Sequence, residues 1–157
     1  MNPTIEYRIP TLLEYNDLRE QVGWGVPDSS ATLESLNNAL HTVCLKLDEE
    51  LIGIGRIVGD GGLFFYIQDI IVKKEYRGNG FSRLIMNDLL EHLRRVARKG
   101  AFIGLFSVKG VEPFYESYGF VSRPNDKFGA GMFIPIENLM KIEQNQSAHT
   151  TPASAPR

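Results

Sequence analysis

The chain has 157 residues, of which 43% are hydrophobic and 23% charged, as is typical of one folded domain with a sizeable core. Its formal net charge is −2, which argues against a nucleic-acid-binding protein, a class that is normally strongly basic. No apolar run approaches the roughly 20 residues of a membrane-spanning helix, and the N-terminus lacks the pattern of a signal peptide. We therefore expect a cytoplasmic protein with no nucleic-acid or membrane partner.

The first half of the chain predicts a short strand, two helices and a three-stranded antiparallel meander. Thr11, followed three residues later by Glu14, has the pattern of a helix capping box. The run from Gly59 to Gly62 is a strong turn signal, and the aromatic and β-branched residues after it predict a strand buried on both faces. In chain order we expect a strand at Thr4–Ile9, helices beginning at Thr11 and Ser30, and strands at His41–Leu47, Leu51–Val58 and Leu63–Val72.

After the meander the hydrophobic period becomes helical. Apolar residues recur at helical spacing from Phe81 to Ala97, and Gly100 ends that stretch. A strand, a long helix and a further strand form a crossover, so the strand at Ala101–Ser107 should lie parallel to the last meander strand. We expect one domain over residues 1–143 and, because its composition is rich in Ser, Thr, Ala, Pro and Gln, a disordered tail over 144–157. The remaining expected elements are a helix at Val111–Tyr118 and strands at 120–122 and 131–135.

Cysteine and histidine usage points to no metal or redox chemistry. The single cysteine, Cys44, stands in an apolar run, where a thiol is more often a small core residue than a nucleophile. A chain with one cysteine cannot form an internal disulfide and fits a reducing compartment. The histidines show no metal-ligand spacing, so we expect no metal.

The junction between the last meander strand and the long helix carries the most informative motif. It reads Arg77-Gly78-Asn79-Gly80-Phe81-Ser82, and its glycines let a ligand approach the backbone closely. The free N–H groups and the dipole of a helix start attract an anion, and no acidic residue lies between Tyr76 and Asn87. Glycines alone would favour a plain turn, but strand, arginine, glycines and amphipathic helix together predict an anion site. P-loop and dinucleotide-binding patterns do not fit.

This junction resembles motif A of the GNAT superfamily of N-acetyltransferases, Arg/Gln-x-x-Gly-x-Gly/Ala. Arg77, Gly80 and Ser82 stand at its three defining places, with Ser82 in place of the usual Gly or Ala. The run from Pro113 to Phe120 resembles motif B, with its ending Phe-Tyr-x-x-x-Gly-Phe. The resemblance covers nearly everything except the tail. It implies the GNAT fold, a mixed α/β fold with a mostly antiparallel sheet, flanked by helices, in which two central parallel strands splay around a cofactor cleft.

The resemblance also implies the chemistry, which is direct transfer of an acetyl group from acetyl-CoA to a primary amine without a metal. Main-chain groups of Ile70, Ile71 and Val72 would pair with the pantetheine arm, and the Val72 N–H would stabilise the thioester oxyanion. Lys73 and Lys74, at the strand exit, are more often simply solvated. The residues that would bind the pyrophosphate are Arg77, Gly78, Asn79, Gly80, Phe81 and Ser82.

Three further residues are candidates for the reaction or the acceptor. Tyr115 stands at the family's usual general-acid place, from which a phenol would protonate the departing thiolate; the alternative is a half-buried packing aromatic. Asp69 is the only acid within the central strand, so it is either the base or a structural hydrogen-bond acceptor. Many family members relay the proton through water, in which case no single base exists. Trp24, in the loop between the first two helices, would stack on an acceptor or anchor the core.

The acceptor and the class of function leave alternatives. A small-molecule amine is the preferred acceptor, because no additional module that would read a protein is evident, and a protein lysine or N-terminus is the alternative. A non-catalytic acyl-CoA-binding module would keep the glycine loop without turnover, and an interaction scaffold would not bind CoA. Acceptor loops are the variable part of such folds, so the sequence does not name the acceptor. The many dimeric relatives leave a homodimer open.

Overall fold

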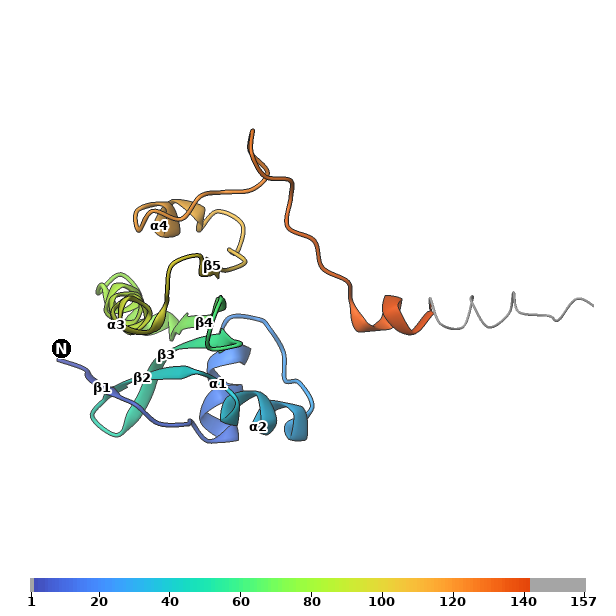
Figure 1. Cartoon of the computed structure of the whole chain (residues 1–157). Coiled ribbons are helices and arrows are strands. Elements are labelled where there is room, and N and C mark those ends of the chain that lie inside the picture. Colours follow the sequence, from blue (N-terminus) through green and yellow to red (C-terminus); the bar gives the residue numbers. More distant parts are fainter. Residues whose placement is uncertain (1, 142–157) are drawn as a thin grey trace, which may run out of the picture. The chain divides into compact units, whose positions relative to one another are not determined.

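A computed structural model describes residues 2–141 of the chain (Figure 1). The chain divides into two compact units, Met1–Val108 and Lys109–Arg157. The expected tail at 144–157 lies outside the described residues, and the single domain over 1–143 stays a prediction. None of the helices within residues 2–141 combines the length and the apolarity that crossing a membrane requires.

The first unit is built on one five-stranded sheet with the order β1-β2-β3-β4-β5. Strands β1 to β4 pair antiparallel, and β5 pairs parallel with β4, which confirms the meander and the crossover. The last strand is shorter than the expected Ala101–Ser107. The strands are β1 (Thr4–Glu6), β2 (His41–Leu47), β3 (Glu50–Gly59), β4 (Phe64–Val72) and β5 (Phe102–Gly104).

Helices cover both faces of this sheet, with α1 (Leu12–Gln21) and α2 (Ser29–Asn37) on one face and α3 (Phe81–Val96) on the other (Figure 1). Helix α1 begins after Thr11, whose hydroxyl accepts a hydrogen bond from the Glu14 N–H at 3.2 Å. The Glu14 carboxylate in turn accepts one from the Thr11 N–H at 2.8 Å, so the predicted capping box is confirmed.

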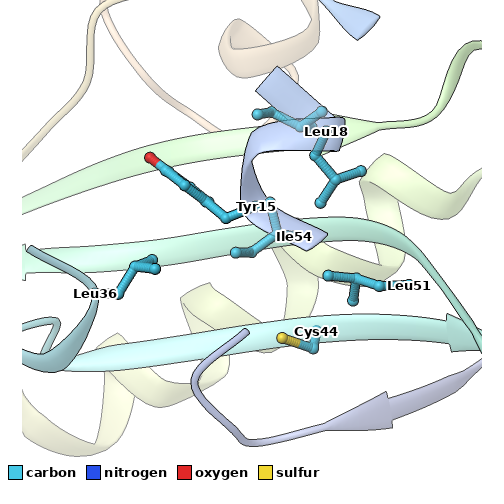
Figure 2. Packing of buried hydrophobic residues seen from close by; sticks show 7 residues of the cluster. Tyr15, Leu18, Leu36, Cys44, Leu51 and Ile54 are labelled. Atoms are coloured by element: carbon cyan, nitrogen blue, oxygen red, sulfur yellow. The ribbon is translucent and has the colours of Figure 1, made fainter. Parts of the chain in front are cut away.

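Buried apolar side chains join α1 and α2 to the sheet (Figure 2). Burying a side chain of the size of leucine stabilises the fold by about 1.5–3 kcal/mol, so this cluster fixes α1 on the sheet. Cys44 is completely buried in it, which confirms its predicted place in the core. The cluster consists of Tyr15, Leu18, Leu36, Cys44, Leu51, Ile54 and Ile71.

Two glycines of β3 allow α3 to pack closely on the other face. A Cβ atom at Gly55 would overlap the Ile85 side chain and would lie 3.0 Å from Leu89 and 3.1 Å from Ile70. A Cβ atom at Gly53 would lie 3.1 Å from the Ile85 side chain. Side chains at these two positions would therefore separate α3 from the sheet. The buried side chains of α3 are Phe81, Ile85, Met86, Leu89 and Leu93.

Strand β4 contains a bulge that the sequence did not predict. Asp69 and Ile70 lie opposite the single β3 residue Gly55, because the register shifts between Ile54 and Arg56. Asp69 has a φ of +58°, in the left-handed region that Asp tolerates better than most residues. One face of β4 is buried and the other is only half-buried, so the predicted burial on both faces is wrong.

The second unit is described from Lys109 to residue 141. Its helix α4 (Glu112–Glu116) is shorter than the expected Val111–Tyr118, and residues 136–141 are helical. Residues 120–122 and 131–135, which we expected to be strands, have no strand structure in this part of the chain. A short apolar run becomes a strand only where a neighbouring strand takes its main-chain hydrogen bonds, and local composition does not supply that neighbour.

Candidate active site

One edge of β4 is paired over only part of its length. The parallel pairing with β5 ends at Tyr66, opposite Gly104. From Ile67 to Val72, no strand of the described residues pairs with this edge. The main-chain groups that face this edge are consequently available to a ligand, apart from the Val72 carbonyl, which accepts a hydrogen bond from Arg77.

The main chain of Val72 faces this unpaired edge. The Lys73 N–H donates to the Ile52 carbonyl of β3 at 2.9 Å, and successive residues of a strand direct their main-chain groups to opposite edges. The Val72 N–H and carbonyl therefore point away from β3, and the Ile70 groups share that direction. Arg77 Nε donates to the Val72 carbonyl at 3.1 Å, which joins the loop after β4 to the end of the strand.

The loop at residues 77–82 follows the short 3₁₀ helix η1 (Lys74–Tyr76) and has a backbone that favours glycine. Gly78 and Gly80 have φ values of +80° and +79°, which side-chain-bearing residues rarely adopt. A Cβ atom at either glycine would meet no heavy atom within 4 Å, so the space beside the loop is open. The Asn79 side chain donates to the carbonyls of Tyr76 and Arg77, at 3.0 and 3.2 Å, and stabilises the turn.

Helix α3 begins after Gly80 without a side-chain cap and without an acidic residue in its first turn. The Arg83 and Leu84 N–H groups both donate to the Gly80 carbonyl, at 3.0 and 3.2 Å. Within residues 2–141, no main-chain carbonyl accepts a hydrogen bond from the Phe81 or Ser82 N–H. These free donors and the helix dipole favour an anion at this end of the helix.

Lys73 and Tyr76 fix the start of this loop to neighbouring elements. Lys73 Nζ lies 2.6 Å from both Asp17 Oδ2 on α1 and Glu50 Oε1 on β3. The Tyr76 hydroxyl donates to Glu50 Oε2 at 2.9 Å. Burial opposes the charge on Lys73, but the two carboxylates outweigh it and raise its pKa. Lys73 is thus a buried, ion-paired residue, and the expectation that it is simply solvated is wrong.

Asp69, the candidate base, lies among hydrogen-bond donors beneath the bulge and is only 3% exposed. Its Oδ2 atom accepts hydrogen bonds from Arg56 Nε at 2.7 Å and from the Tyr15 hydroxyl at 2.8 Å. Its Oδ1 atom accepts one from Gln68 Nε2 at 3.1 Å, and Arg56 also donates to the Ser35 carbonyl at 2.9 Å. This geometry favours the structural alternative for Asp69, and its role as a base stays a prediction.

Trp24 lies in a loop that Arg19 holds. Arg19 Nε donates to the Gly25 carbonyl at 3.1 Å, and Nη2 donates to the Trp24 carbonyl at 3.2 Å. The guanidinium carbon also lies 5.6 Å from the centroid of the Trp24 ring. Trp24 is 37% exposed, so it does not anchor the core. Its contact with an acceptor stays a prediction.

Tyr115 lies on α4 in the second unit. Its ring packs against Phe114 and Phe120, with centroid distances of 5.1 and 6.2 Å. Burial raises the pKa of Tyr115 above its ordinary value of 10.0, so the phenol keeps its proton throughout the physiological range. That is the state which a general acid needs, and its role as the acid stays a prediction.

The family of this chain follows from a comparison with known proteins. The model of the acetyltransferase (GNAT) domain matches residues 24–135. The chain belongs to the GNAT acetyltransferase family. This GNAT acetyltransferase is also similar to a solved protein of unknown function from meticillin-resistant Staphylococcus aureus, described as a probable acetyltransferase. The two are 34% identical, with a TM-score of 0.79, over 85% of this chain and 99% of that one.

One further relative agrees with this assignment, and one more distant structure shares the fold. The uncharacterised N-acetyltransferase ycf52 of Pyropia yezoensis is 25% identical over 118 residues, which span 73% of this chain and 67% of the relative. AAC(6')-Iy, solved in complex with the bisubstrate analogue CoA-S-monomethyl-acetylneamine, has a TM-score of 0.60 over 85% of this chain and all of its own. At 16% identity the latter shows the fold alone. The GNAT acetyltransferase described here is thus an N-acetyltransferase, an enzyme of the acyltransferase class.

The structure brings together most of the predicted donor-site residues of this GNAT acetyltransferase. Ile70 and Val72 share the unpaired edge of β4, and the loop at 77–82, which follows η1, is joined to the end of that strand by the hydrogen bond from Arg77 to the Val72 carbonyl. Ile71, from the same predicted set, pairs with Ile54 of β3, and its side chain lies in the core. The binding roles of all these residues stay predictions.

Sequence analysis missed the side chains that surround Asp69. Tyr15 and Arg19 come from α1 and Arg56 from β3, and no local pattern relates these positions to one another. One signal was available, because Arg56 is a basic residue inside an otherwise apolar strand, where a charge needs a partner. The acid in the neighbouring strand, Asp69, is that partner.

Proposed function

We propose that this enzyme transfers the acetyl group of acetyl-CoA to the primary amine of a small molecule. The observation that carries the proposal is the uncapped start of α3, which the loop after β4 joins to the unpaired edge of that strand. The free N–H groups of Phe81 and Ser82 would bind the pyrophosphate, with the charge of Arg77 close by. Main-chain groups of Ile70 and Val72 would pair with the pantetheine arm as a further strand does.

The residues present fit such a donor substrate. The space beside Gly78 and Gly80 is open, and both glycines hold the backbone in the conformation that presents the loop. The likeness to AAC(6')-Iy supports the same choice, because that protein binds an analogue containing CoA. The other part of its analogue, acetylneamine, is a small amine and supports a small-molecule acceptor.

In the reaction, the amine nitrogen attacks the thioester carbonyl carbon, the carbon–sulfur bond breaks, and the thiolate leaves as CoA after taking a proton. The Val72 N–H, which is directed away from β3, would donate to the developing oxyanion. Tyr115, which keeps its proton, would supply the proton to the thiolate. Because the Asp69 carboxylate is held by Arg56 and Tyr15, we propose that water removes the proton from the attacking amine.

An acceptor screen with thiol detection tests this proposal. The purified enzyme is mixed with acetyl-CoA and, one at a time, with amino sugars, aminoglycosides, polyamines, amino acids and lysine-containing peptides, and free CoA is followed over time. We expect at least one small amine to release CoA well above the rate of hydrolysis in its absence. The Gly80→Val variant, whose loop cannot keep its backbone conformation, is the matched inactive control.

The screen also separates the alternatives. Turnover with peptides but with no small amine would show a protein acetyltransferase. Binding of CoA in calorimetry without turnover of any amine would show a non-catalytic acyl-CoA-binding module. The absence of both binding and turnover would contradict the proposal and leave an interaction scaffold.

A further inference from the structure

A chain of hydrogen bonds runs from the bulge of β4 to the loop that carries Trp24. Asp69 Oδ2 accepts a hydrogen bond from the Tyr15 hydroxyl at 2.8 Å, and the hydroxyl oxygen accepts one from Arg19 Nη1 at 3.5 Å. The other nitrogens of Arg19 donate to the Trp24 and Gly25 carbonyls, at 3.2 and 3.1 Å. Every link pairs a donor with an acceptor, because Arg19 donates both to the Tyr15 hydroxyl and to the two loop carbonyls.

We propose that the Tyr15 hydroxyl is a positioning group, which through Arg19 holds the loop at residues 23–27 in a fixed place relative to β4. This proposal rests on the proposed function, in which β4 binds acetyl-CoA, and on the prediction that Trp24 contacts the acceptor. The loop would then present an amine to the thioester bound along β4. Small errors in such a placement are costly, because the reacting atoms must lie close together and be correctly oriented.

Packing makes Tyr15 suited to this task. The residue is only 4% exposed, and its ring lies in the core cluster between α1 and the sheet. Figure 2 shows the hydroxyl directed away from Leu51 and Cys44, so that the apolar end of the ring is enclosed and the polar end is free to make the link. A side chain whose rotamer is fixed by the core can hold its neighbours in place.

Arg19 is connected to Asp69 mainly through the Tyr15 hydroxyl, because Arg56 occupies the direct ion pair with that carboxylate. Arg56 makes the direct ion pair with Asp69, with 2.7 Å from Nη2 to Oδ2. Arg19 lies farther from the same carboxylate, with 4.0 Å from Nη1 to Oδ1. Its guanidinium carbon lies 5.6 Å from the ring centroids of both Tyr15 and Trp24. These contacts hold the Arg19 guanidinium beside both rings, and its hydrogen bond to the Tyr15 hydroxyl links it to Asp69.

The chain contains one tryptophan, so fluorescence excited at the long-wavelength edge of the tryptophan band, where tyrosine does not absorb, reports on the Trp24 loop alone. The test compares Tyr15→Phe with Tyr7→Phe, which also removes one tyrosine–carboxylate hydrogen bond, from the Tyr7 hydroxyl to Asp88 Oδ2 at 2.6 Å. Both variants keep their aromatic ring. The measurements are the emission maximum of Trp24, its quenching by acrylamide, the thermal midpoint, and calorimetry with CoA.

For Tyr15→Phe we expect emission at longer wavelength and stronger quenching by acrylamide, with CoA affinity unchanged, because the loop is released and β4 is not. Tyr7→Phe should match the parent in both fluorescence measurements. Arg19→Lys keeps the charge and loses the planar fork, so it should reproduce the change, and the double variant should add nothing to it.

Parent-like quenching in Tyr15→Phe, or an equal change in Tyr7→Phe, would overturn the proposal. So would additive effects in the double variant, because they would show that Tyr15 and Arg19 act separately. Failure of the parent to bind CoA would instead overturn the proposed function, and the fluorescence comparison would still decide whether Tyr15 holds the loop.

Discussion

The Nε and Nη2 atoms of Arg56 both lie 2.7 Å from the same oxygen of Asp69, Oδ2, beneath the bulge of β4. This contact joins β3 and β4 at the point where their register shifts and where Asp69 adopts a positive φ. A strained backbone of this kind persists only where its surroundings hold it. The ion pair is therefore part of what keeps the bulge in shape.

Asp69→Asn should lower the free energy of unfolding by about 3 kcal/mol, because the buried Arg56 loses its counter-charge. Urea denaturation measures the change. Asp48→Asn is the matched control, since Asp48 also has a positive φ but lies exposed in a turn, and there we expect a change within about 0.5 kcal/mol. Parent-like stability of Asp69→Asn together with lost turnover would support the catalytic base in place of the structural role.

Gly80→Ala should reduce the affinity for CoA, because the alanine backbone resists the φ of +79° that presents the loop. Gly100→Ala is the control: Gly100 has a φ of +91° and open space around it, but it follows the opposite end of α3. Both variants should lose about 1 kcal/mol of stability from the left-handed backbone. Calorimetry should show weaker CoA binding for Gly80→Ala only. Equal affinities of Gly80→Ala and the parent would show that the loop at 77–82 does not bind CoA.

Tyr115→Phe should lower turnover by about 100-fold if the phenol protonates the departing thiolate. CoA affinity should be nearly unchanged, since the ring is retained. Burial raises the pKa of Tyr115, so the parent should lose activity only above pH 10, and the variant should lack that decline. Tyr118→Phe, three residues further along, is the control, and equal rates for parent and Tyr115→Phe across pH would leave Tyr115 as a packing residue.

Acid should weaken the fold through Glu14. Hydrogen bonds from Arg8 lower the pKa of Glu14 from 4.5 to about 2. A carboxyl with a lowered pKa stabilises the folded state above its unfolded pKa, and this contribution disappears as the pH falls from 4.5 towards 2. Both side chains are partly exposed, so the contribution is about 1 kcal/mol. In urea titrations, Glu14→Gln should show a shallower loss over this range, and an identical pH dependence would contradict the assignment.

The Cys44 thiol should be unreactive in the folded protein. Burial raises its pKa to about 11, so very little thiolate is present at neutral pH. Iodoacetamide at pH 8 should leave the native chain unmodified by mass spectrometry and should alkylate it fully in urea. Rapid labelling of the native chain would show that Cys44 opens to solvent, and would also add a background to thiol-based assays.

Local patterns predicted much of this fold. The capping box at Thr11, the helical period of α3 and the glycine loop at 77–82 each depend on residues a few positions apart, and the structure shows all three elements. The parallel placement of β5 followed from the order strand, long helix, strand, because a crossover helix returns the chain to the same end of the sheet.

The surroundings of Asp69 could not be predicted in this way. Its partner Tyr15 is 54 positions away in the sequence, and the bulge that turns Asp69 towards α1 is a property of strand register, which no short segment of sequence specifies. Lys73 shows the same limit, because its two carboxylates come from α1 and β3. The strands expected at 120–122 and 131–135 were predicted from composition, and composition does not name a pairing partner.

Gly53 and Gly55, which allow α3 to pack closely on β3, also influence the position of the N-terminus of that helix. Helix α3 packs through Ile85 and Leu89 against these two glycines of β3. Its N-terminus carries the unpaired N–H groups of Phe81 and Ser82. A methyl group at Gly55 would overlap Ile85 and displace α3 from the sheet, which would change the position of the helix N-terminus relative to the end of β4. The affinity for the phosphate that we propose at this end of α3 would therefore depend on Gly55, a residue of the buried strand β3.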